Sequence, residues 1–333
     1  MQSGVISILR LHQGREKPRF WKNGRPNLDG IEYTVIRNLS TAVLAFIGGS
    51  LDMTWPYSVR IPLLKDIRSQ APQAICELAP NKVSSNLIVN HDAPPFQNPG
   101  LRRAMALSLD RKAFIDILSD GQGDIGGVMQ PPPEGVWGMP PDVLQTLPGY
   151  GPDIQKNRSE ARRIMQTLGY GPDNRLKIKV STRNTPFYRD PAVILIDQLK
   201  EVYIDGELEI IDTTNWYPKV MRKDYTVGLN LTGNTLDDPD QNFYENYACG
   251  AVGNYNGYCN PEVDKLIDRQ STEPDQEKRK QLVGNREKVG GGRRSADHLL
   301  RSARDLLAAL RERVDDHGQQ RLQRCAHGRR LAG

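Results

Sequence analysis

The chain has 333 residues, of which 38% are hydrophobic and 26% are charged. This length is enough for about two domains with their own cores, and no stretch approaches the ~18 consecutive apolar residues that cross a bilayer. The net charge of +5 comes from residues 289–333, which hold ten Arg and five acidic residues, so residues 1–288 are neutral and offer no basic stripe for a nucleic-acid backbone.

The first third of the chain is predicted to be rich in β-structure with short helices. Ser40 is a suitable N-cap for a helix over 41–47, which ends at Gly48. The other elements expected here are a helix over 61–69 and strands over 31–37, 52–55, 74–78 and 85–90.

A rigid proline-rich link over 94–99 marks a boundary between the first third and the rest of the chain. Apolar residues then recur at helical spacing over 100–118, which predicts a helix pair or one long amphipathic helix. The proline-rich segment 130–141 excludes a helix or a central strand. Another helix is predicted over 156–168.

The clearest pattern is a β-α-β-α-β alternation between residues 176 and 231, followed by two helices. The predicted strands are 176–182, 207–212 and 225–231, and the predicted helices are 191–203, 216–222, 261–270 and 273–288. Such alternation favours an α/β fold with parallel neighbouring strands. Ligands of these sheets bind beyond the carboxyl ends of the strands, so the loops after the three strands should form one binding edge.

Polar and aromatic side chains in these loops are suited to binding a solute. An arginine can pair with a carboxylate through two hydrogen bonds, tyrosine and tryptophan offer flat apolar walls, and aspartates can receive an ammonium group. The candidates are Arg183, Asn184, Trp216, Tyr217, Asp237, Asp238 and Tyr255. Two alternatives stay open: an ordinary surface arginine at 183 and a core aromatic at 216.

The sequence contains no motif in the context that a catalytic, dinucleotide or metal site requires. The G-x-G-x-x-G motif at 121–126 follows a predicted helix, whereas a dinucleotide site needs a strand before it and a helix after it. His12 and His91 are the only histidines before residue 289, and neither lies near a nucleophile turn. The acidic run 237–240 lacks the glycine and glutamate of a calcium loop. We therefore predict no catalytic residue, no metal site and no cofactor.

The four cysteines form no C-x-x-C pair, so a zinc ribbon is excluded. Cys249 and Cys259 flank a polar loop. If bonded, they would stabilise that loop by roughly 2–3 kcal/mol and would require an oxidising compartment; two unpaired thiols are the alternative. No secretory signal is visible at the start of the sequence, so as written the chain is expected to stay in the cytoplasm.

Three stretches of the chain are FWKNGRPNLDGI at 20–31, NHDAPPFQNPGLRRAMALSLDR at 90–111 and NGYCNPEVDKLI at 256–267. They closely resemble signature segments of the family 5 extracellular solute-binding proteins, the peptide/nickel-type receptors of bacterial ABC importers. The resemblance covers about residues 20–288. It implies a periplasmic-binding-protein-like (type II) α/β lobe, with a mixed sheet flanked by helices, and a partial second lobe.

The resemblance also implies a function. Members of this family capture a solute without catalysis, and here the solute would be a peptide or a peptide-like molecule. They act in the periplasm and present the solute to an ABC permease complex in the inner membrane. We expect a monomer that binds no nucleic acid. The alternatives are a non-functional truncated fragment and an α/β hydrolytic enzyme.

Some family residues can be transferred to this sequence. Arg183 matches an arginine that dipeptide-type members use near the ligand carboxylate. Those members place an amine-binding aspartate in a Gly-Asp-x-x-Asp-Pro segment, which corresponds here to TGNTLDDP at 232–239. Either Asn234 stands at the aspartate's position, or the loop is one residue longer and Asp237 takes that role. The pair Cys249 and Cys259 resembles a disulfide found in some relatives.

The resemblance divides the chain into three parts. Residues 1–89 correspond to a fragment of the first lobe, and residues 90–288 to the second, ligand-binding lobe. Residues 289–333 form an Arg-rich tail outside the family pattern, which we interpret as an out-of-frame translation. The same comparison indicates that the chain lacks the N-terminal part of family members.

Overall fold

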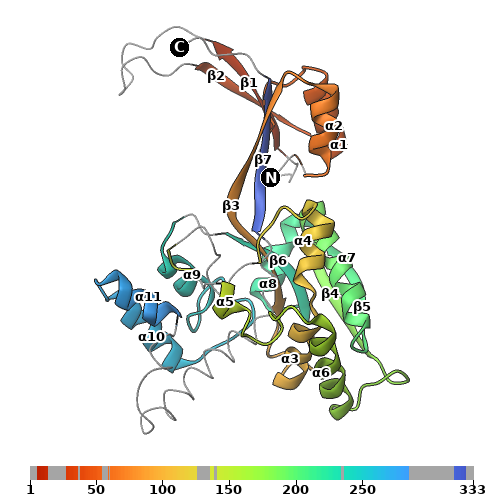
Figure 1. Cartoon of the computed structure of the whole chain (residues 1–333), viewed down its shortest axis with the longest axis vertical. Coiled ribbons are helices and arrows are strands. Elements are labelled where there is room, and N and C mark those ends of the chain that lie inside the picture. Colours follow the sequence, from red (N-terminus) through yellow and green to blue (C-terminus); the bar gives the residue numbers. More distant parts are fainter. Residues whose placement is uncertain are drawn as a thin grey trace. The chain divides into compact units, whose positions relative to one another are not determined.

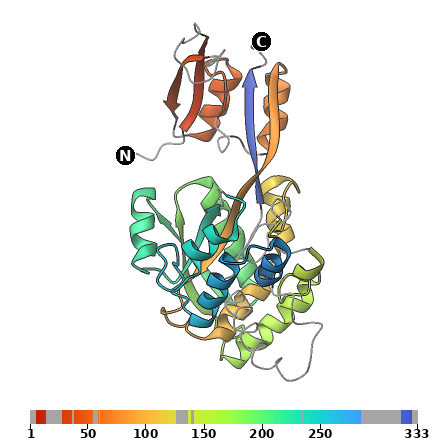
Figure 2. The ribbon, with the colours of Figure 1, turned by 90° about the vertical axis from the view of Figure 1, so that its left-hand side faces the viewer.

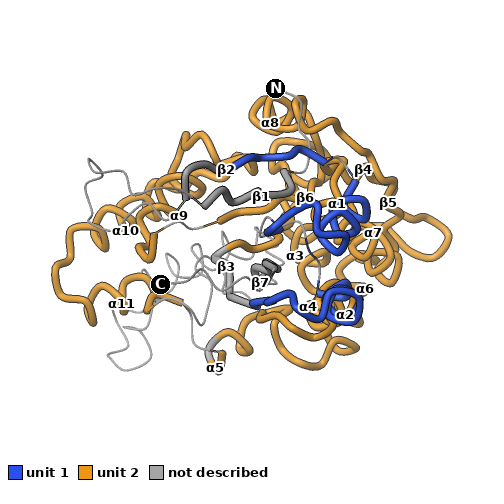
Figure 3. Tube along the Cα trace, turned by 90° about the horizontal axis from the view of Figure 1, so that it is seen from above, with its two compact units in different colours: residues 1–81, 321–333 blue, residues 82–320 orange. Residues whose placement is uncertain are grey.

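The computed structural model describes residues 6–13, 28–36, 38–54, 59, 61–125, 136–138, 141–233, 236–284 and 319–327. Two compact units divide the chain (Figure 3). One comprises Met1–Asn81 with Arg321–Gly333, and the other comprises Lys82–Gln320. The division lies within strand β3 (Ala74–Val89). The predicted three-part division at 89/90 and 288/289 stays a prediction.

The first unit contains a hairpin and two short helices. Strands β1 (Ile6–Gln13) and β2 (Leu28–Val35) pair antiparallel. Helices α1 (Leu39–Ile47) and α2 (Leu63–Gln70) contribute apolar side chains to a small core. The N-cap of α1 is Asn38, whose Oδ1 accepts a hydrogen bond of 3.0 Å from the Thr41 amide. The predicted cap at Ser40 is therefore wrong, because the helix begins at Leu39, two residues earlier than predicted.

The five-stranded sheet of the chain is mixed (Figure 1), and its strands β4, β5 and β6 belong to the second unit. The strand order is β5-β4-β6-β3-β7, where β4 pairs parallel with β5 and β6, and β3 pairs antiparallel with β6. The strands not yet bounded are β4 (Leu176–Arg183), β5 (Ile204–Ile211), β6 (Val227–Gly233) and β7 (Gln319–His327). The predicted α/β class is confirmed, including the mixed sheet flanked by helices.

Helices connect and cover these strands. Helices α10 and α11 pack against each other (blue in Figure 2). Their bounds and those of the other helices are α3 (Pro99–Ser108), α4 (Arg111–Ser119), α5 (Pro141–Leu144), α6 (Ile154–Thr167), α7 (Pro186–Lys200), α8 (Thr213–Met221), α9 (Pro239–Asn246), α10 (Pro261–Ser271) and α11 (Gln276–Gly284). The helical spacing of apolar residues over 100–118 therefore comes from a helix pair, α3 and α4, and not from one long helix.

Two boundaries differ from the predictions for physical reasons. The strands expected at 74–78 and 85–90 are parts of one strand, β3. Helix α7 begins at Pro186 rather than at Pro191. A proline at the first helical position loses nothing because its amide would have no intrahelical partner, and the second proline removes only one hydrogen bond of a 15-residue helix.

The alternation of side chains along β3 shows the two faces of the sheet. Leu87 and Val89 join the main core with residues of α3, α6 and α7. Ile88 points to the other face, where it packs with Trp216 and Val220 of α8. Successive side chains of a strand face opposite sides, so this sheet has helices on both faces. None of the helices in the described ranges is long and apolar enough to cross a membrane.

Candidate functional site

The carboxyl ends of β4, β5 and β6 lie at the same edge of the sheet because these strands run parallel. Arg183 is the last residue of β4. Its Nη1 donates a hydrogen bond of 2.9 Å to the hydroxyl of Tyr188, and its Cζ lies 4.6 Å from the centre of the Tyr188 ring. The ring of Tyr217, on α8, lies 5.5 Å from the same Cζ. We call these three residues the Arg183 cluster.

The charge of Arg183 is not compensated by a carboxylate. Within the described ranges, no Asp or Glu forms an ion pair with it, and its Nε is buried without a hydrogen-bond partner. Burial raises the pKa of Tyr188 to about 12; the Arg183 charge opposes this rise and Tyr217 adds to it. Tyr188 is therefore neutral at physiological pH, and its ring lies beside the half-buried guanidinium.

Trp216 and Tyr217 are neighbours in sequence but lie in different environments. The Trp216 side chain is fully buried, and its Nε1 lies 3.4 Å from Asn230 Oδ1. A Cβ at position 228 would come within 3.2 Å of the indole, so Gly228 allows the ring to lie close to the sheet. Tyr217 is 41% exposed. Adjacent helical side chains point about 100° apart, so Trp216 fills the core and Tyr217 joins the edge.

Two other residues fix this edge. Asp212, the N-cap of α8, accepts a hydrogen bond of 2.8 Å from the Thr214 amide through Oδ1. This contact, together with the Thr214 hydroxyl, lowers the pKa of Asp212. Asn184 is exposed, and its backbone amide donates to the Ile211 carbonyl at 3.1 Å. The start of α8 and the end of β4 are thereby held beside one another.

The loop after β6 contributes a second group of predicted residues. Asn234 lies outside the described residues. Asp237 is exposed, and its carbonyl accepts a hydrogen bond of 2.9 Å from Trp137 Nε1. Asp238 caps α9 and forms two hydrogen bonds, of 2.7 and 3.0 Å, with Arg279. These bonds hold the pKa of Asp238 below its usual value. Its carboxylate is therefore already paired.

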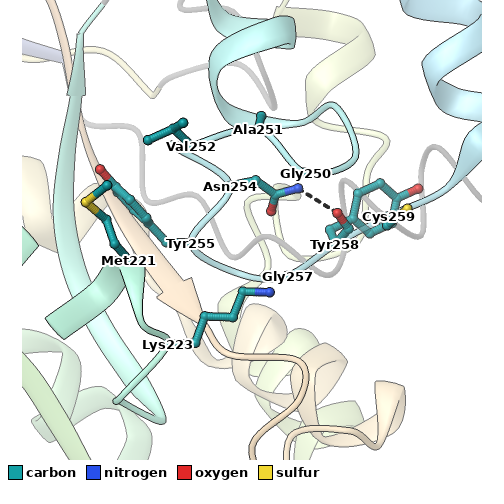
Figure 4. Close-up of a pocket in the computed structure, with 10 residues that line it drawn as sticks. All are labelled: Met221, Lys223, Gly250, Ala251, Val252, Asn254, Tyr255, Gly257, Tyr258 and Cys259. Atoms are coloured by element: carbon teal, nitrogen blue, oxygen red, sulfur yellow. Dashed lines mark hydrogen bonds between the residues drawn. The ribbon is translucent and has the colours of Figure 1, made fainter. Parts of the chain in front are cut away.

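Tyr255 packs against the apolar cluster that contains Trp216 and Val220 of α8. It lines a pocket of about 400 Å³ with Met221 and Lys223 (Figure 4). The Tyr225 hydroxyl donates to its carbonyl at 2.9 Å, and Tyr225 lies two residues before the start of β6. The pocket therefore lies near the amino end of β6, where Val227 pairs with Val180 in the middle of β4.

The wall of this pocket is a loop closed by a disulfide. Cys249 and Cys259 are bonded, with a Cα–Cα distance of 4.6 Å. Inside the loop, Asn254 Nδ2 donates to the Ala248 and Tyr258 carbonyls at 3.1 and 2.6 Å. Side chain–backbone bonds of this kind leave the loop few alternative conformations. We found no group of three or more His, Cys, Asp or Glu in the described part of the chain that could hold a metal ion.

Sequence reasoning missed three residues of these sites: Tyr188, Trp137 and Arg279. Tyr188 lies in a segment that the sequence assigns to a loop between a strand and a helix. Trp137 lies in the proline-rich segment, and Arg279 is one of several charged residues on α11. Their contacts join residues far apart in the chain, such as the 100 positions between Trp137 and Asp237. No local pattern marks such pairs.

Comparison with known proteins gives a consistent result. The family described as "Bacterial extracellular solute-binding proteins, family 5 Middle" matches residues 13–254. The peptide transport periplasmic protein SapA of Salmonella typhimurium is 24% identical over 80% of this chain and 46% of its own length. The oligopeptide-binding protein OppA of Bacillus subtilis is 25% identical over 86% and 51%. The chain spans about half the length of these curated relatives.

Solved structures show the same fold. Haemophilus influenzae OppA, in complex with the peptide RPPGFSPFR, superposes with a TM-score of 0.70 at 20% identity, over 88% of this chain and 53% of that one. The periplasmic binding protein DppA of Helicobacter pylori, in complex with the peptide STSA, gives a TM-score of 0.75 at 16% identity, over 98% and 57%. The architecture is therefore that of the periplasmic peptide-binding proteins.

Proposed function

Because the chain belongs to the bacterial extracellular solute-binding proteins of family 5, we propose that it is the substrate-binding component of an ABC importer and captures a peptide or peptide-like solute. Capture is non-covalent and takes place at the edge of the sheet that carries the Arg183 cluster. The names of the matched relatives, which are peptide-binding proteins, support this ligand class.

The observation that carries the proposal is the uncompensated charge of Arg183. A half-buried cation without a carboxylate partner is costly, and an anion that enters the site removes that cost. A peptide carboxylate fits a guanidinium through two parallel hydrogen bonds. The Tyr188 and Tyr217 rings flank the guanidinium and limit its movement. Arg183 is therefore assigned to the solute carboxylate.

The remaining candidates take different roles in this proposal. Asn184 and Tyr217 are exposed at the same edge and are assigned to contacts with the body of the solute. Asp237 is exposed and keeps its carboxylate for a cationic group of the solute. Trp216 and Asp238 act indirectly, since one is in the core and the other is paired with Arg279.

We extend the proposal to the partners and the compartment. The family consists of extracellular binding proteins, and a receptor of this kind serves in the periplasm, as a monomer, beside an inner-membrane permease. The role includes no chemical step, so a bound peptide leaves the site intact. The disulfide Cys249–Cys259 supports an oxidising compartment.

A peptide screen tests this function. The purified chain is titrated with a tripeptide library by calorimetry, and the recovered peptides are analysed by mass spectrometry. We expect saturable binding with every peptide recovered intact. Arg183→Gln should abolish most of the binding, whereas Arg189→Gln, which removes an arginine paired with Asp190 on α7, should not. Cleaved peptides, or no binding by any peptide, would contradict the proposal.

A further inference from the structure

Arg279 occupies an unusual position for a residue of a charged surface helix. It lies on α11, yet its side chain is only 14% exposed. Its guanidinium forms two hydrogen bonds with Asp238, at 2.7 and 3.0 Å, and a third with Asp240 Oδ1 at 3.1 Å. Its Nε donates to Gln270 Oε1 at 3.0 Å. All these acceptors belong to α9, its N-cap or α10.

Trp137 completes the contact from another part of the chain. The Arg279 Cζ lies 4.8 Å from the centre of the indole ring, a distance at which a cation and an aromatic face attract each other. The indole Nε1 donates to the Asp237 carbonyl at 2.9 Å. The Asp237 backbone and the Asp238 carboxylate are thus held by one arginine–tryptophan pair. We call Arg279, Trp137 and Asp238 the Arg279 clamp.

The clamp acts on the loop that follows β6. The Leu236 amide donates to Gln241 Oε1 at 3.1 Å, which holds Leu236 against α9. The Asp238 carboxylate pairs with Arg279 and accepts a hydrogen bond from the Asp240 amide at the start of α9. Asp237, between them, has a fixed backbone and an exposed side chain. Fixing a binding group in advance lowers the ordering cost when a ligand arrives.

We infer that Arg279 is a positioning residue for solute recognition: by clamping Trp137 and Asp238, it orients Asp237 toward the cationic group of the bound solute. Arg279 itself does not touch the solute. The inference rests on the proposed function, because it presumes that Asp237 receives that cation.

A purely structural role for Arg279 makes a different prediction. If the clamp only joins α9 to α11, its loss lowers the free energy of unfolding and weakens all ligands equally. If it positions Asp237, its loss reduces the preference for a ligand with a free amine over one without. The ratio of the two affinities therefore separates the two roles, even where stability changes as well.

The experiment compares trialanine with N-acetyl-trialanine by calorimetry. Arg279→Gln should weaken trialanine binding about tenfold and leave N-acetyl-trialanine binding unchanged. Asp238→Asn, which keeps a good N-cap residue, should give the same loss, and the double variant should show no further loss because the pair acts as one unit. The matched control is Lys280→Gln on the same helix, which breaks only an exposed pair with Glu277.

Hydrogen exchange of the tryptophan side chains verifies that the variants stay folded. In Arg279→Gln the Trp137 indole proton should exchange faster, while the fully buried Trp216 indole should not change. Equal weakening of both peptides, or an unchanged ratio of affinities, would overturn the inference. A wild-type chain that binds neither peptide would overturn the proposed function itself, and the inference with it.

Discussion

Two parts of the Lys82–Gln320 unit differ in how their charged groups are paired. At the amino end of β6, Lys223 pairs with Asp92 at 3.5 Å, and the neighbouring loop is closed by a disulfide. At the carboxyl end of β4, Arg183 contacts two tyrosines and no carboxylate of the described ranges. In the first part the charged groups are paired, whereas the Arg183 guanidinium has no carboxylate partner among the described residues.

Helix α8 contributes an exposed side chain to each of these two places, and both side chains lie on the same face of the helix. Tyr217 and Met221, four residues apart, are 41% and 52% exposed. Residues at this spacing share a helix face. Tyr217 contributes to the Arg183 cluster, and Met221 lines the pocket near the amino end of β6. Exposed apolar side chains therefore do not distinguish the two places, whereas the unpaired charge does.

The largest effect is expected for the buried neighbour of Tyr217. Trp216→Ala should lower the free energy of unfolding by about 3–5 kcal/mol, because it empties a fully buried site beneath the sheet. Tyr217→Ala should cost about 1 kcal/mol or less in stability and should weaken peptide binding instead. Urea denaturation and calorimetry measure the two quantities. Equal destabilisation by both variants would contradict the assignment of one ring to the core and the other to the edge.

Removal of the disulfide should have the next largest effect. The double variant Cys249→Ser/Cys259→Ser frees the loop in the unfolded chain and should cost roughly 2–3 kcal/mol of stability. Peptide affinity should not change, because the loop contributes no residue to the Arg183 cluster. Thermal unfolding with and without reductant gives the stability, and a peptide titration gives the affinity. A loss of affinity as large as that of Arg183→Gln would show that the loop and the Arg183 cluster are not independent.

The smallest effect concerns the pH dependence of the Arg279 clamp. Arg279 holds the pKa of Asp238 below its ordinary value of 3.8, so the stabilisation is fully present above that pH. It is lost as the pH falls from 3.8 through the lower pKa of the folded state. The melting temperature of the wild type should therefore exceed that of Asp238→Asn at about pH 6, and the difference should shrink at about pH 3. A difference that stays constant over this range would mean that the pair contributes nothing.

Much of the second unit could be predicted because its signals are local. Alternating apolar residues marked β4, and the recurring strand–helix pattern marked a sheet with parallel neighbours. The position of Arg183 at the end of β4 followed directly from the bounds of that strand. Residues that end a strand are thus within reach of sequence reasoning.

Side-chain orientation could not be predicted in the same way. Whether Trp216 or Tyr217 faces the core depends on the rotational phase of α8, which begins at Thr213 behind the Asp212 cap and not at 216 as expected. The role of Asp238 depended on Arg279, 41 residues later in the chain. Pairing at such separations is decided by the packing of whole elements and leaves no trace in the spacing of nearby residues.

The assignment of Arg183 to the solute carboxylate is tested most directly by a double cycle. A tripeptide that binds in the screen is compared with its C-terminal amide, each on the wild type and on Arg183→Gln, by calorimetry. We predict that amidation weakens binding to the wild type by about tenfold or more and has almost no effect on Arg183→Gln. An equal loss on both proteins would contradict the assignment, because the carboxylate would then be bound elsewhere.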